Sequence, residues 1–124
     1  MKKPTRKSLV IKLDTIFSQY IRRKDAISDI AICITCGKKD HWKKLQNGHF
    51  QSRSHYSTRW LESNVGVQCY GCNISRSGEQ YKFSQYLGDN LAQEMYIKSK
   101  QIVKFADIDL IEMIDYYTEK VNNI

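Results

Sequence analysis

The chain has few residues that break a backbone and no long apolar run. Its 124 residues include one proline and six glycines, with no internal repeat and no low-complexity segment. No apolar stretch approaches the roughly 20 residues that a membrane-spanning helix needs. The basic N-terminus also lacks the apolar segment of a signal peptide. We therefore expect a cytoplasmic, globular protein without a membrane partner, and one domain for a chain this short.

Cysteine and histidine are also scarce, with four cysteines and three histidines in the chain. The cysteines form two Cys-x-x-Cys pairs, Cys33 with Cys36 and Cys69 with Cys72, separated by residues 37–68. Cytosolic thiols stay reduced, which favours metal binding over disulfides. Four thiolates complete a tetrahedral zinc site with no open position, so the zinc is expected to be structural. The alternative is a pair of disulfides or redox dithiols.

The whole chain has a formal net charge of +7, and its basic residues are concentrated in the first half. Residues 1–24 hold eight Lys/Arg and one Asp, whereas residues 83–124 hold seven acidic and four basic residues. Clustered Lys/Arg is what a phosphate backbone attracts, so this half is expected to bind nucleic acid. The alternative is a charged surface that only keeps the protein in solution.

Hydrophobic spacing predicts three segments along the chain. Residues 1–11 are expected to form a flexible basic arm. Residues 12–88 would form the zinc-stapled domain, beginning with an amphipathic helix from Leu13 to Ile27. Residues 89–124 would add two C-terminal helices, with Asp107 or Asp109 as the cap of the last one.

Between the helices we expect short strands at Ala31–Thr35, Leu45–Gln51 and Val65–Gln68, a polar loop over residues 52–63, and a helix from Glu79 to Leu87. A further helix is expected from Asn90 to about Phe105. The last helix carries an apolar stripe, expected to be core or a dimer surface, of Leu110, Ile114, Tyr117 and Val121.

The segment between the cysteine pairs carries a second pattern. Gly48-His49 lies on an expected strand, Asn64 is separated from Cys69 by four residues, and Asn73 follows Cys72 directly. With CITCGKK, NGHFQSR, TRW, NVGVQCYGCN and SGEQYKFSQYL, this order resembles the phage NinG/Rap recombination nucleases, members of the HNH or ββα-metal superfamily. The cysteines and Asn73 are also similar to those of phage endonuclease VII. The resemblance covers roughly residues 12–88.

The resemblance implies an α+β fold with a ββα-metal core, and it implies roles for three residues. His49 would be the general base, since a neutral imidazole accepts a proton near pH 7. Asn64 would fix the loop that orients this base. Asn73 would hold a catalytic Mg²⁺ or Mn²⁺, because an amide oxygen is a hard ligand. If the protein is phage-encoded, it would work in the host cytoplasm.

One position departs from the HNH pattern. Many of these enzymes carry an acidic metal ligand directly before the base, and Gly48 stands there in this chain. Either the missing ligand comes from elsewhere, with His55 and Glu79 favoured over Asp40 and Glu62, or Mg²⁺ is held mainly by Asn73, substrate phosphate and water. The alternatives are a surface loop residue for His55 and an early-helix acid for Glu79.

Several cations are expected along the DNA backbone. Arg53 and Arg59 flank the loop after the expected base, and the alternative for both is a surface ion pair. The remaining candidates lie on the first helix or after the second cysteine pair, and they are Arg22, Arg23, Lys24, Arg76 and Lys82.

Three functions therefore compete. The first is a metal-dependent DNA endonuclease that acts, by the resemblance, on branched recombination intermediates such as D-loops and Holliday junctions, plausibly as a C2 dimer. The second is a zinc-stabilised DNA-binding module without catalysis, which the missing acid before His49 keeps open. The third is a protein-interaction module that uses the acidic C-terminal helices.

Overall fold

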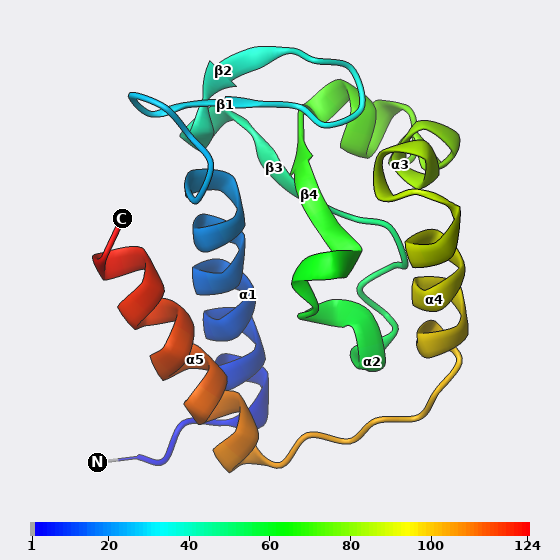
Figure 1. Ribbon diagram of the computed structural model, residues 1–124. Helices are drawn as coiled ribbons and strands as arrows, with labels where there is room; N and C mark the ends of the chain where they lie inside the picture. The colour runs from blue at the N-terminus through cyan, green and yellow to red at the C-terminus, as the bar shows by residue number, and fades with distance from the viewer. Residues whose placement is uncertain (1) are drawn as a thin grey trace.

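A computed structural model describes residues 2–124, which fold into helices around two short antiparallel hairpins (Figure 1). In chain order the elements are α1 (Arg6–Arg23), β1 (Ile30–Ile32), β2 (Lys39–His41), η1 (Trp42–Lys44), β3 (Gln46–His49), α2 (Tyr56–Arg59), η2 (Glu62–Asn64), β4 (Val65–Gln68), η3 (Gly71–Ser75), α3 (Gln80–Leu87), α4 (Asp89–Ser99) and α5 (Asp107–Asn122). The expected α+β class is confirmed. No helix of the described residues has the length and hydropathy to cross a membrane.

Helix α1 begins earlier than expected, so the second half of the predicted arm, residues 1–11, is helical from Arg6. The Thr5 side chain caps it by accepting a hydrogen bond from the Ser8 backbone N–H at 3.1 Å. Such a cap satisfies an N–H that has no partner within the helix. A buried stripe then recurs at four-residue spacing along the helix: Leu9, Leu13, Phe17 and Ile21.

Helix α5 covers this stripe with its own. Leu110, Ile114, Tyr117 and Val121 are all buried, and α1 and α5 lie side by side in Figure 1. The expected stripe is therefore core within one chain and is not free to form a dimer surface. The predicted cap at Asp107 or Asp109 is wrong, because Ala106 is the N-cap residue; Asp109 lies in the first turn, where its carboxylate accepts a hydrogen bond from the Ala106 N–H at 2.8 Å.

The two hairpins are adjacent and antiparallel. In the first, Ile30 pairs with His41 and Ile32 with Lys39; in the second, Gln46 pairs with Gln68 and His49 with Val65. The backbone N–H of Ile34 donates to the Val67 carbonyl at 2.8 Å and joins the first hairpin to β4. Strand β4 has the predicted bounds, whereas β1 and β3 are shorter than the predicted Ala31–Thr35 and Leu45–Gln51.

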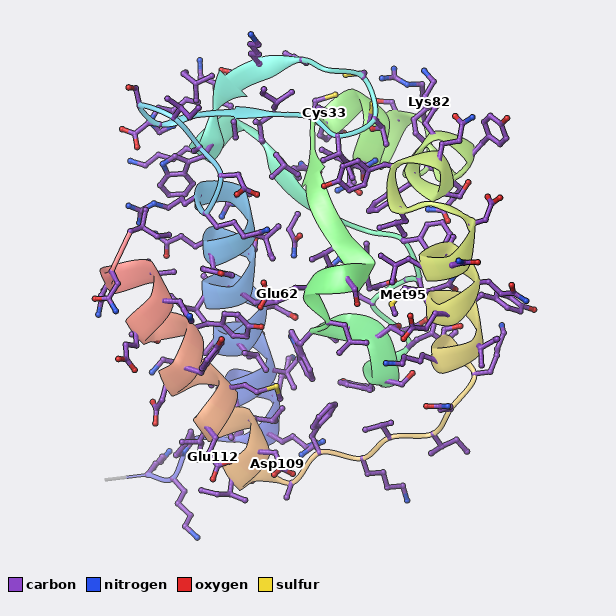
Figure 2. All side chains as sticks on the ribbon, in the orientation of Figure 1. Cys33, Glu62, Lys82, Met95, Asp109 and Glu112 are labelled. Carbon is purple, nitrogen blue, oxygen red and sulfur yellow. The ribbon has the colours of Figure 1, made fainter. Side chains whose placement is uncertain are left out.

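Two other segments differ from expectation. The polar segment 52–63 contains the short helix α2 and the start of η2, because Thr58 and Trp60 within it are buried. Helix α4 ends at Ser99 instead of reaching Phe105, and residues 102–106 are extended. Its buried Met95 faces η2 and the β3–β4 hairpin in Figure 2.

The core has two parts. The larger cluster combines the α1 and α5 stripes with Trp60 and Val65, so α5 shares one core with the β3–β4 hairpin although it belongs to the predicted C-terminal extension, residues 89–124. The smaller cluster surrounds the cysteines and includes Ala31 and Leu45.

Candidate functional site

The four cysteines converge on one point between the hairpins. Their Sγ atoms all lie within 4.8 Å of one another, and the Cys36 and Cys69 sulfurs are 3.6 Å apart. That distance is too long for a disulfide between these two sulfurs, which would be about 2.05 Å apart, and all four cysteines are free. Four thiols at this separation fit a zinc ion in tetrahedral coordination. Cys33, Cys69 and Cys72 are buried, and Cys36 is exposed.

Hydrogen bonds to sulfur support this cysteine cluster. The Cys72 backbone N–H donates to Cys69 Sγ at 3.4 Å, and Arg76 Nη2 donates to Cys72 Sγ at 3.2 Å. The Thr35 hydroxyl lies 3.3 Å from Cys33 Sγ. Donors of this kind stabilise thiolates, as a zinc site requires. Arg76, expected on the DNA backbone, is therefore engaged with the metal centre.

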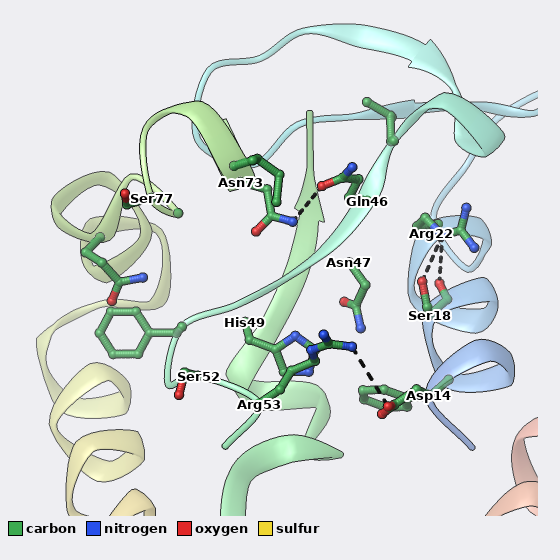
Figure 3. Close-up of a pocket in the computed structure, with 16 residues that line it drawn as sticks. Asp14, Ser18, Arg22, Gln46, Asn47, His49, Ser52, Arg53, Asn73 and Ser77 are labelled. Atoms are coloured by element: carbon green, nitrogen blue, oxygen red, sulfur yellow. Dashed lines mark hydrogen bonds and ion pairs between the residues drawn. The ribbon is translucent and has the colours of Figure 1, made fainter. Parts of the chain in front are cut away.

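A cleft of about 810 Å³ opens beside the metal centre. It lies between α1, strand β3 with the residues after it, and the segment that follows Cys72 (Figure 3). Its lining consists of Asp14, Phe17, Ser18, Arg22, Leu45, Gln46, Asn47, His49, Phe50, Ser52, Arg53, Asn73, Ile74, Ser77, Gly78 and Gln80. The cleft therefore brings together four residues predicted separately, namely His49, Asn73, Arg22 and Arg53.

His49 ends strand β3 and has one ring nitrogen fixed. Its Nε2 lies 2.9 Å from the backbone carbonyl oxygen of Arg59. A carbonyl only accepts, so Nε2 carries the proton and Nδ1 is the basic nitrogen of the neutral ring. Burial lowers the pKa of His49 below its ordinary value of 6.5. The ring is therefore neutral, and able to accept a proton, at pH 7.

Asn64 is fully buried and binds the loop that follows His49. Its Nδ2 donates to the carbonyls of Gln51 at 3.0 Å and Thr58 at 3.1 Å, and its Oδ1 accepts from the Gln51 N–H at 2.9 Å. The loop between these contacts leads into Arg59, whose carbonyl holds His49. Asn64 thus lies outside the cleft but fixes the backbone that orients His49.

Asn73 faces the cleft from η3, directly after the second cysteine pair. Its Nδ2 donates to Gln46 Oε1 at 2.7 Å, as the dashed line in Figure 3 shows. Because this bond fixes the amide orientation, Oδ1 is left as a free acceptor. Its backbone N–H donates to the Cys69 carbonyl at 2.9 Å, so the metal centre determines where Asn73 lies.

The structure gives a physical reason for Gly48. A Cβ atom on this residue would lie 1.9 Å from Gln68 Oε1 and 2.6 Å from Gln68 Cδ. Gln68 is fully buried and donates from Nε2 to Thr35 Oγ1 at 3.1 Å and to the Gly78 carbonyl at 2.8 Å. The space that an acidic side chain would need before the base is therefore filled by Gln68.

Neither of the two candidates for the missing ligand lines the cleft. His55 precedes α2, and its side chain makes no capping hydrogen bond there. Glu79 pairs with Arg76 at 3.5 Å and with Lys82 at 3.3 Å. Lys82 is labelled in Figure 2 and lies on helix α3.

The other expected cations have mixed surroundings. Arg22 lines the cleft, and it donates to the Ser18 and Trp42 carbonyls at 3.2 and 3.3 Å. Arg22 and Arg23 each lie 5.1 Å from the centre of the Trp42 ring. Lys24 pairs with its neighbour Asp25 at 3.2 Å.

Sequence reasoning missed Asp14, the acidic residue in the cleft lining. Its carboxylate accepts from Arg59 Nε at 3.1 Å and from Trp60 Nε1 at 2.9 Å, and Arg53 Nη1 lies 3.9 Å away. Nothing in the spacing of Asp14 on an amphipathic helix distinguishes it from a solvent-facing acid. The contact spans 45 residues of sequence, so only the fold reveals it.

These features define a small α+β protein with a cluster of four cysteines that could bind a metal, beside a basic cleft that holds a histidine and an asparagine. The chain belongs to the family described as bacteriophage Lambda NinG protein, whose family model matches residues 2–124. This membership confirms the resemblance seen in the motifs and extends it over nearly the whole chain. No curated protein and no solved structure matches the chain.

Proposed function

We propose that this protein is a metal-dependent DNA endonuclease of the HNH, or ββα-metal, type. The observation that carries the proposal is His49, whose Nε2–H is bound to the Arg59 carbonyl so that Nδ1 is the basic nitrogen in a cleft shared with Asn73 and two arginines. The β3–β4 hairpin and the helical segment after Cys72 would form the ββα unit.

In this proposal His49 acts as general base. Nδ1 takes a proton from a water molecule, the water oxygen forms a bond to phosphorus, and the bond from phosphorus to the departing sugar oxygen breaks. That oxygen takes a proton from solvent, and His49 then releases its own proton to solvent. General bases of this kind contribute about 10²- to 10⁴-fold to a rate.

The cleft offers few oxygen atoms that could bind a second metal. Asn73 Oδ1 fits a hard cation, whereas Gln46 Oε1 is occupied by the Asn73 amide and the Asp14 oxygens by Arg59 and Trp60. Mg²⁺ commonly keeps several waters and uses one or two protein ligands with substrate phosphate. When bound by Asn73, such an ion would neutralise charge on the phosphate and on the departing oxygen.

The arginines of the cleft would hold the DNA backbone. Arg53 has its side chain 64% exposed, so its guanidinium is accessible to a phosphate oxygen. Arg22 contributes charge on the α1 side of the same cleft. Charge-assisted bonds to phosphate position the substrate, and they weaken as salt rises.

Branched recombination DNA is the proposed substrate, and a homodimer the proposed working form. Both rest on the resemblance to recombination nucleases and on the two symmetric cuts that a junction needs. The test is incubation with a four-way junction or a linear duplex of the same sequence, with Mg²⁺, Mn²⁺ or EDTA. Metal-dependent cleavage of the junction in preference to the duplex is expected; junction cleavage that continues in EDTA would contradict the metal requirement.

The second candidate is a DNA-binding module without catalysis. It is favoured by one observation, the occupied Asp14 carboxylate, which leaves the cleft lining without a free acid. Salt-sensitive junction binding with no cutting in any divalent metal would support it. Binding of DNA that is weak and independent of salt would instead favour a protein-interaction module, because backbone contacts must release counterions.

Two histidine variants separate these outcomes. His49→Ala should abolish cleavage while junction binding persists, because the base is removed and the arginines remain. His41→Asn is the matched control, since His41 lies outside the cleft lining and its Nδ1 only accepts from the Lys43 N–H at 3.1 Å. Asparagine keeps that acceptor, so cleavage should be unchanged.

A further inference from the structure

The carbonyl that orients His49 belongs to a short element that needs external support. Arg59 is the last residue of α2, a helix of four residues, and helices this short are unstable alone. Asn64 fixes the loop before it, but its bond to α2 is to the Thr58 carbonyl and not to Arg59. The position of the Arg59 carbonyl therefore depends on what holds the Arg59 side chain.

That side chain is held by α1. Arg59 Nε donates to Asp14 Oδ1 at 3.1 Å, and Arg59 Nη2 pairs with Asp14 Oδ2. Trp60, the next residue, donates from Nε1 to the same carboxylate at 2.9 Å. Two consecutive residues are thus tied to one carboxylate on another element.

The remaining nitrogen of the guanidinium ties the other end of the loop. Arg59 Nη1 donates to the Arg53 backbone carbonyl at 2.8 Å. The Arg59 side chain is 13% exposed and the Asp14 side chain 21%, so this is a partly buried, two-point pair and not a flexible surface contact. With its nitrogens engaged in this way, Arg59 is poorly placed to bind phosphate, which was its expected role.

We propose that Asp14 is a positioning residue that fixes the His49 ring through Arg59, so that α1 forms one half of the active site. The chain of contacts is Asp14 carboxylate, Arg59 guanidinium, Arg59 backbone carbonyl and His49 Nε2–H. It holds the ring in the tautomer that leaves Nδ1 basic. This inference rests on the proposed function of His49 as base, but the geometry it describes can be measured without cleavage.

The test uses Asp14→Asn in the full chain. Asparagine keeps the shape and one acceptor oxygen, but it loses the charge and the two-point pairing with Arg59. We expect kcat on a four-way junction to fall about tenfold with KM unchanged, as for other partners that orient a catalytic histidine. Long-range ¹H–¹⁵N NMR spectra of the ring nitrogens should show the Nε2–H tautomer alone in the wild type and a mixture of tautomers in the variant.

DNA binding separates positioning from a phosphate-binding role for Arg59. If Arg59 serves phosphate, Asp14→Asn frees it, so junction affinity should rise and kcat should not fall. That result would overturn the proposal, and so would a wild-type tautomer in the variant. Arg59→Lys is a second variant that keeps the charge without the fork; it should give the same mixed tautomer if Asp14→Asn is too unstable to purify.

The matched control is Asp107→Asn. Asp107 pairs with Arg6 of α1 at 3.2 Å, and both side chains are about half exposed, at 57% and 49%. This variant also loses an aspartate–arginine pair that involves α1, but the pair joins α1 to α5 and neither residue lines the cleft. The kcat and the tautomer of His49 should therefore not change. Failure of the proposed function would give a different result. If the wild-type protein cuts no DNA but His49 changes tautomer in Asp14→Asn, the positioning role of Asp14 stands and the nuclease assignment is wrong.

Discussion

At the scale of single residues, the candidate site depends on which atoms are already engaged. His49 has one nitrogen committed to a carbonyl, and Asn73 has its amide nitrogen committed to Gln46. Each is left with one atom for chemistry, Nδ1 as a base and Oδ1 as a ligand. This division follows from hydrogen-bond polarity and requires no bound substrate.

The protonation of His49 gives a prediction for pH. Because burial lowers its pKa, the free base is the dominant form at pH 7 and is lost only when the pH falls below the ordinary value of 6.5. The single-turnover cleavage rate should level off toward neutral pH and should decrease on the acid side with an inflection below 6.5. An acid inflection above 6.5 would contradict the assignment.

The contact of Gly48 with Gln68 gives a second prediction at this scale. Gly48→Ala should destabilise the protein by about 1–3 kcal/mol, because the new Cβ displaces a buried side chain that makes two hydrogen bonds. Urea denaturation measures the change. In the double variant Gly48→Ala/Gln68→Ala, the loss should be smaller than the sum of the two single losses. Additive losses would mean that the two side chains do not compete for the same space.

At the scale of elements, short segments are placed by residues far away in the chain. The loop between β3 and α2 is held at Gln51 by Asn64 and at Arg53 by the guanidinium of Arg59, which is itself paired with Asp14 of α1. The position of Asn73 is set by η3, which contains Cys72 of the cysteine cluster. The positions of the site residues therefore depend on contacts between elements and not on any single strand or helix.

The loop held by Asn64 can be tested directly. Asn64→Ala removes three hydrogen bonds of a fully buried amide and leaves the Gln51 N–H and carbonyl without this partner, whereas the Thr58 carbonyl keeps the Leu61 N–H at 3.2 Å. Each buried group left unsatisfied costs about 1–3 kcal/mol. Hydrogen exchange of the Gln51 amide should become faster than in the wild type. Unchanged protection of this amide would show that Asn64 does not hold the loop.

What the sequence predicted at this scale depends on the range of the signal. The α1 and α5 stripes, the two cysteine pairs and the Gly-His strand are local patterns, and each was found. The ends of the elements were less accurate, because Thr5 capped α1 earlier than the stripe indicated and α4 stopped at Ser99. Asp14, Gln46 and Gln68 could not be assigned, because their roles arise from contacts across 20 residues or more.

At the scale of the whole molecule, the helices at the two ends of the chain enclose the larger core cluster. The first and last helices pack together, and Trp60 and Val65 connect them to the hairpin that carries His49. The cysteine cluster lies at the opposite end, where only a small cluster of buried apolar residues is available, so a metal bound there would stabilise this end. A short chain gains much of its stability from such a metal site.

The contribution of α5 gives a prediction. Leu110→Ala should destabilise the protein by about 2–5 kcal/mol, because Leu110 is fully buried against the α1 stripe. Ile108→Ala on the same helix is the control, since Ile108 is 58% exposed and should change stability by less than about 0.5 kcal/mol. Urea denaturation compares them. Equal stability of both variants would mean that residues 89–124 are dispensable for the core.

Removal of zinc gives the other prediction for the whole molecule. Metal binding energy is folding energy in sites of this kind, so a strong chelator or Cys72→Ser should unfold the region around the hairpins. Elemental analysis should give one zinc per chain, and far-ultraviolet circular dichroism should show the loss of structure. A metal-free chain with an unchanged thermal transition would contradict a structural zinc site.

We propose that His49 removes a proton from water during DNA cleavage. Single-turnover kinetics on a saturating four-way junction measures this role directly. The rate constant of His49→Ala should be at least about 100-fold below that of the wild type, while its junction affinity stays within a factor of about two. A rate constant equal to that of the wild type would contradict the claim.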